Sequence, residues 1–94
     1  MPYIKSDDRP MIRVGVQLLA PSIKTPGELN YAISTLVSHY LDIQSKVRSD
    51  NPLAKPNYAL YNEAIGVLEC AKLELYRHTI SQYEEVKIKE NGDI

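Results

Sequence analysis

Residues 57–83, NYALYNEAIGVLECAKLELYRHTISQY, have the composition of one long helix. Good helix formers dominate this stretch, and no proline interrupts it. A helix in a small domain normally needs one apolar stripe, which it buries against its own chain. This stretch carries two apolar stripes, so we expect the second one to face another molecule. The sequence therefore indicates self-association or binding of a partner rather than catalysis.

The first stripe is the expected core face of the long helix. Successive helical residues are rotated by about 100°, and this rotation gathers one broad arc of mostly apolar side chains. The arc consists of Leu60, Tyr61, Ala64, Ile65, Val67, Leu68, Ala71, Leu75 and Tyr83. We expect it to pack on the apolar face of a preceding helix.

That preceding helix has the clearest start signal in the chain. Thr25 is an N-cap residue with Glu28 in the capping-box position, and Pro26 stands at the first helical position. The helix is predicted to run to about Gln44. Its apolar face is Leu29, Ala32, Ile33, Leu36, Val37, Tyr40 and Ile43. Residues 45–56 hold several turn and breaker residues and are predicted to be a linker before the long helix.

Residues 11–20 support two interpretations. The alternation of Ile12, Val14 and Val16 with other residues fits a strand. Helix-capping residue types at positions 6–8, Pro10 in a first turn and the helical remainder of the chain favour a helix. As a helix, the segment places on one side Met11, Ile12, Gly15, Leu18 and Leu19. We expect the helix, and so an all-α protein of two or three helices in one domain over residues 1–94.

The second stripe of the long helix has a seven-residue spacing. Two interleaved series, one starting at Ala59 and one at Glu63, give a heptad-like seam. The seam consists of Ala59, Glu63, Gly66, Cys70, Leu73, Arg77 and Ile80. It is nearly symmetric about Cys70, so an antiparallel second copy would place its Arg77 opposite Glu63. We predict an antiparallel homodimer, or a larger oligomer, through this interface. The alternative is that residues 11–20 cover the seam within one monomer.

Composition argues against several classes of function. The chain has 94 residues and a formal net charge of −1, which gives no electrostatic reason to bind nucleic acid or an anionic membrane surface. No apolar run approaches the ~20 residues of a membrane span. The single cysteine, Cys70, cannot form an internal disulfide, and a reducing compartment is the simplest setting. We therefore expect a cytoplasmic protein with no nucleic-acid or membrane partner.

The residues that carry catalysis or bind metals are sparse. The two histidines are His39 and His78, and Cys70 lies two helical turns from His78, too far for a nucleophile and its base. A zinc site needs about four ligands, which these residues do not provide. We expect no enzyme activity, no cofactor and no metal.

A binding site for a small anionic ligand is the remaining chemical hypothesis. Tyrosine can stack on a base, asparagine can bind an amide-like edge, and arginine can hold a phosphate. The candidate ligand-binding residues are Asn30, Tyr31, Asn62, Glu69, Tyr76 and Arg77. The same side chains are also suited to helix capping and interface hydrogen bonds, the commoner role of such groups.

Several runs of the sequence carry a resemblance. They are PYIK at 2–5, GELNYAI at 27–33, NEAIGVLECAKLE at 62–74, YR at 76–77, YE at 83–84 and KIKENGD at 87–93. The chain resembles, over most of its length apart from the first element and the linker, a family of short uncharacterised proteins of bacteria and their phages. The resemblance implies no established activity. It implies a host-modulating or counter-defence role, in which the protein sequesters a nucleotide-like signal or binds a host protein. The alternative is a structural or assembly component of a phage or protein complex, without a ligand pocket.

Overall fold

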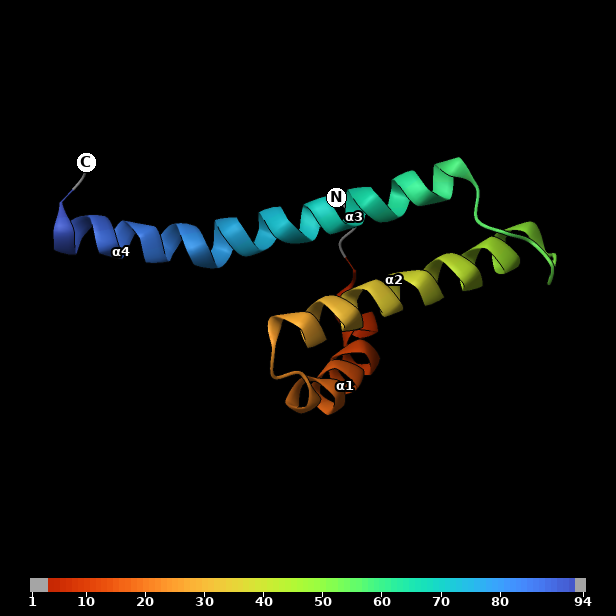
Figure 1. Ribbon diagram of the computed structural model, residues 1–94, viewed down its shortest axis with the longest axis horizontal. Coiled ribbons are helices and arrows are strands. Elements are labelled where there is room, and N and C mark those ends of the chain that lie inside the picture. Colours follow the sequence, from red (N-terminus) through yellow and green to blue (C-terminus); the bar gives the residue numbers. More distant parts are fainter. Residues whose placement is uncertain (1–3, 93–94) are drawn as a thin grey trace. The chain divides into compact units, whose positions relative to one another are not determined.

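The computed structural model describes residues 4–92, and every regular element in them is helical (Figure 1). The elements are η1 Ser6–Asp8, α1 Arg9–Leu19, η2 Ala20–Ser22, α2 Pro26–Ser49, α3 Tyr58–Leu75, η3 Tyr76–Ile80 and α4 Ser81–Asn91. The expected all-α fold with a long C-terminal helix is confirmed, because α3, η3 and α4 form one helical run of 34 residues. The chain divides into two compact units, Met1–Tyr61 and Asn62–Ile94.

Helix α1 confirms the helical interpretation of residues 11–20. Pro10 lies in its first turn, where the missing N–H has no helical partner to lose. Asp8 stands at the N-cap position but makes no side-chain capping bond. Pro21 lies in the short 3-10 helix η2, which ends the element. Every residue of α1 is exposed.

Helix α2 begins with the predicted cap in a slightly different form. The backbone N–H of Glu28 donates to the Thr25 hydroxyl at 3.1 Å, as a capping box requires. The Glu28 carboxylate accepts instead from the N–H of Lys24, at 2.9 Å, one residue before the N-cap. Two backbone donors of the helix entrance are therefore satisfied by side chains.

Helix α2 ends later than the sequence predicts, and the linker prediction is corrected accordingly. It continues to Ser49, so the connection to α3 covers residues 50–57 instead of 45–56. The added turn holds no proline or glycine, and it is supported by the Lys46–Asp42 ion pair at 2.8 Å. Asp50 then adopts a left-handed conformation with φ 54°, which turns the backbone out of the helix.

The connection folds back on the last turns of α2. Ser45 is buried, and its hydroxyl donates to the Asp42 carbonyl at 2.8 Å, with the Ala54 carbonyl 3.5 Å from the same oxygen. The side chain of Asn51 accepts from the N–H of Leu53 at 3.0 Å. These contacts give the connection a defined path.

The long helical run begins at Tyr58, as the predicted stretch 57–83 requires, and continues beyond Tyr83 to Asn91. The Asn57 side chain accepts from the N–H of Leu60 at 2.9 Å, which caps the first turn. Gly92, with φ 82°, follows the last helical residue, and its N–H donates to the Ile88 carbonyl.

The predicted core face is buried only in part. Among residues 4–92 the buried apolar side chains are Leu60 and Ala64, whereas Ile65 is 65% and Tyr83 62% exposed. On α2, Leu36 is 69% exposed. The second unit consists of one helical run, so no other element of that unit can cover its apolar side chains.

A π-helical turn, Tyr76–Ile80, interrupts the long run, and no pattern in the sequence indicates it. In η3 the N–H of Ser81 donates to the carbonyl of Tyr76, five residues earlier, in place of the usual four. The extra residue rotates all later residues back by about 100° relative to a regular α-helix. This brings Tyr83 and Val86 into line with Ala71 and Leu75, on the side of the predicted core face.

Candidate functional site

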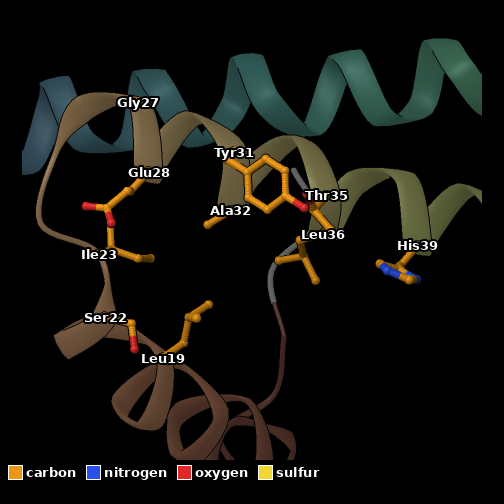
Figure 2. A pocket seen from close by; sticks show the side chains of 10 residues that line it. All are labelled: Leu19, Ser22, Ile23, Gly27, Glu28, Tyr31, Ala32, Thr35, Leu36 and His39. Carbon is orange, nitrogen blue, oxygen red and sulfur yellow. The ribbon is translucent and has the colours of Figure 1, made fainter.

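The first unit contains a groove between the end of α1 and the N-terminal half of α2 (Figure 2). Its volume is about 570 Å³. The lining residues are Leu19, Ser22, Ile23, Gly27, Glu28, Tyr31, Ala32, Thr35, Leu36 and His39. Figure 2 shows Leu19 and Leu36 reaching into it from opposite sides. The backbone at Ile23 is extended, and this connection sets the distance between the end of α1 and the start of α2.

The chemistry of this groove is mainly apolar. The Glu28 carboxylate at its rim already accepts the hydrogen bond from Lys24. Thr35, His39 and the hydroxyl of Tyr31 supply further polar groups on the α2 side. Such a surface suits hydrocarbon or aromatic groups far better than a phosphate, because no lysine or arginine lines it.

The predicted ligand-binding residues belong to two units. Asn30 and Tyr31 lie in α2 of the first unit, and both are exposed. Tyr31 lines the groove, whereas Asn30 does not. The other four candidates, Asn62, Glu69, Tyr76 and Arg77, lie in the second unit.

In the second unit the candidates follow one side of the helix. Asn62, Glu69 and Tyr76 are spaced by seven residues, close to two helical turns each. Asn62 and Tyr76 are therefore separated by about 21 Å along the axis, more than one nucleotide-sized ligand spans. Tyr76 and Arg77 are neighbours at the start of η3, so this pair is close enough to contact one small ligand together.

These side chains also take part in local pairs. Glu69 lies 3.1 Å from the Lys72 ammonium, and Arg77 donates to Glu74 at 3.3 Å. The Tyr76 hydroxyl donates to Glu84 at 3.1 Å, and this bond to a carboxylate raises the pKa of Tyr76 above its usual value. The pairs are exposed, so each contributes little to stability.

The seam is regular through α3 and changes at η3. Along α3, Ala59, Glu63, Gly66, Cys70 and Leu73 keep the heptad spacing on one side of an uninterrupted α-helix. Arg77, at the start of the π turn, stays close to this line. Ile80, at its end, is rotated away from the line by about 100°. The predicted interface therefore loses its last residue, because the heptad count assumed a regular helix.

Most of the seam is exposed. No atom lies within 4 Å of a Cβ added to Gly66, so space for another backbone is open there. Leu73 is 47% exposed, and the thiol of Cys70 is free and half-buried.

The groove and the π turn are the two features that sequence reasoning missed. The groove depends on how residues 23–25 turn the chain, which no residue pattern specifies. The sequence places Leu19 and Leu36 on the apolar faces of two helices. That apolar character is the one sequence signal that could have indicated the groove. Within residues 4–92 no group of three His, Cys, Asp or Glu lies together as metal ligands do. In the same residues no helix is both long enough and apolar enough to cross a membrane.

The described residues define a small all-α protein with one apolar groove in its first unit. It belongs to the family described as Domain of unknown function (DUF6899), which matches residues 1–94. No curated protein and no solved structure matches the chain.

Proposed function

We propose that this chain is a non-catalytic helical binding protein whose first partner is a second copy of itself. The observation that carries the proposal is the second unit, one helical run with large apolar side chains that are substantially exposed, among them Ile65, Leu73 and Leu75. An isolated helix in water gains little from its own hydrogen bonds and depends on packing for stability.

The seam provides the register for an antiparallel homodimer. Gly66 allows close approach of a partner helix, and Arg77 of one copy faces Glu63 of the other. Arg77 now pairs with Glu74 at 3.3 Å, and both side chains reach solvent. Breaking an exposed ion pair of this kind costs little free energy. The Arg77–Glu74 pair therefore does not prevent Arg77 from pairing with Glu63 of the second copy.

Charge exchange tests the seam directly. Glu63→Arg and Arg77→Glu alone should each weaken the dimer, and the double exchange should restore it, as measured by sedimentation equilibrium. Lys72→Glu is the matched control, because it makes the same charge change as Arg77→Glu away from the seam. Single exchanges with the dissociation constant of the wild type would overturn the seam as the interface.

A small anionic, nucleotide-like ligand is a second candidate partner. The observation that favours it is the exposed pair Tyr76 and Arg77 at the π turn, since π turns occur frequently at functional sites. The resemblance to bacterial and phage proteins suggests the biological role. The chain would be a host-modulating or counter-defence protein of the cytoplasm that sequesters such a ligand or binds a host protein. A nucleotide that raises the unfolding temperature of the wild type but not of Arg77→Ala would support it. No shift with any nucleotide would contradict it.

A structural or assembly role without a small ligand is the alternative that the groove favours. Its apolar lining matches protein side chains. An assembly protein should form defined large species and show no thermal shift with nucleotides, whereas a ligand-sequestering protein should show the shift at a fixed oligomer size.

A further inference from the structure

Helix α1 exposes a complete apolar side. Met11 is 86% exposed, Leu18 77%, Ile12 58% and Leu19 50%. The opposite side of the helix carries Arg9, Arg13 and Gln17. An amphipathic helix with its apolar side in water marks an interaction surface, because soluble monomers rarely leave such patches uncovered. The seam does not include this surface, which lies in the first unit.

The sequence of α1 is symmetric in character about Gly15. Counting outward from this glycine, each of the four positions on either side has a mirror position of the same kind, apolar with apolar and polar with polar. The mirrored pairs are Val14 and Val16, Arg13 and Gln17, Ile12 and Leu18, and Met11 and Leu19. No like-charged pair occurs among them.

This symmetry identifies the kind of partner. In a two-fold contact between identical antiparallel helices, each residue meets its mirror residue of the other copy. Centred on Gly15, such a contact would join apolar to apolar side chains from Met11 to Leu19. A second copy placed antiparallel about Gly15 would therefore meet each apolar side chain of this surface with another apolar side chain, whereas an unrelated partner offers no reason for the mirrored pattern.

The centre of the symmetry is also the point where helices can approach most closely. No atom lies within 4 Å of a Cβ added to Gly15. A glycine in the middle of a helix costs about 1 kcal/mol relative to alanine. Close contact with the backbone of another helix would explain why a glycine stands at this position.

The groove is continuous with this surface. Leu19 belongs both to the apolar side of α1 and to the groove lining. In the two-fold contact the partner's Met11 would meet Leu19, at the edge of the groove. Methionine is the flexible side chain best able to fill irregular space, and Met11 is the most exposed large apolar residue of α1.

We propose that α1 is a second self-association surface, in which two copies pair antiparallel about Gly15 and cover the groove edge. The proposal rests on the proposed self-association and extends it, because two separate two-fold contacts on one chain join dimers into a larger assembly.

Light scattering on the full chain tests the proposal. The wild type should have a mass above that of a dimer, and Leu18→Glu should reduce it to the dimer mass. Gln17→Glu is the matched control, with an added carboxylate on the polar side, and should keep the larger mass. Gly15→Arg should also give the dimer, and its loss of assembly cannot come from a weaker helix, since arginine favours helix more than glycine does.

The outcomes separate this proposal from the seam. A wild-type protein of dimer mass that Leu18→Glu and Gly15→Arg leave unchanged would overturn the α1 contact alone and retain the seam dimer. A larger assembly that neither variant reduces would likewise overturn the α1 contact. A wild-type monomer at all concentrations would overturn both.

Discussion

The phenolic hydroxyl of Tyr76 donates a hydrogen bond of 3.1 Å to the carboxylate of Glu84, eight residues further along the chain. In a regular α-helix, residues at this spacing are rotated about 80° from each other. The π turn Tyr76–Ile80 adds one residue and reduces the rotation to about 20°. The Tyr76–Glu84 bond therefore depends on the π turn and reports its presence.

The first prediction concerns the titration of Tyr76. Its pKa is raised from the ordinary 10.0, first by the hydrogen bond to Glu84 and then by the charge of that carboxylate. Because the folded-state pKa is the higher one, the bond stabilises the helix below pH 10 and is lost as the pH rises through the folded-state pKa. Glu84→Gln should lower the pKa of Tyr76 toward 10.0, as followed by NMR. Glu85→Gln is the control. An unchanged Tyr76 titration in Glu84→Gln would contradict the bond.

The second prediction removes the extra residue of the π turn. Deletion of Thr79, which is exposed, should leave a regular α-helix with the same helical circular dichroism. It should nevertheless lower the pKa of Tyr76, because Glu84 would rotate away from the Tyr76 side. Retention of the raised pKa after the deletion would show that the π turn does not position Glu84.

The third prediction concerns the left-handed residue at the end of α2. Asp50 has φ 54°, a conformation that favours glycine, and its carboxylate lies at the negative end of the helix dipole. Asp50→Gly should stabilise the fold by about 0.5–1 kcal/mol, measured by urea unfolding at fixed protein concentration. Asp50→Ala, which keeps the strain, should not stabilise it. Equal stabilities of the two variants would contradict this reading of the helix end.

The fourth prediction tests the N-cap of α2. Thr25→Ala removes the oxygen that accepts from Glu28, and it should destabilise the protein by about 1 kcal/mol. Thr25→Ser retains the acceptor and should remain close to the wild type. Thermal unfolding at one protein concentration checks both variants, and a Thr25→Ala protein as stable as the wild type would contradict the assigned role.

The parts of the fold that the sequence predicts are those with local causes. Thr25, Asn57 and Gly92 cap or end helices through neighbours within a few residues, so their patterns can be read without a structure. The sequence predicts too early an end for α2, because serines and charged residues at 45–49 resemble a linker in composition. In the structure these residues extend the helix by one more turn, and it ends at Ser49.

The candidate site was predictable only in part, for a geometric reason. The heptad count placed Ile80 on the seam, but one added residue in η3 moved it away. The groove joins Leu19 of α1 to Leu36 of α2, and the path of residues 23–25 determines that juxtaposition. Neither a backbone hydrogen-bond shift nor a loop path leaves a periodic signal in the sequence.

The solution mass of the wild-type protein decides whether the chain self-associates. Light scattering over a dilution series should give a mass well above the 10.7 kDa of one chain and a decrease toward that value only at the lowest concentrations. A mass of 10.7 kDa at every concentration, with full helical circular dichroism, would contradict the account, since the apolar helix faces would then be stable without a second copy.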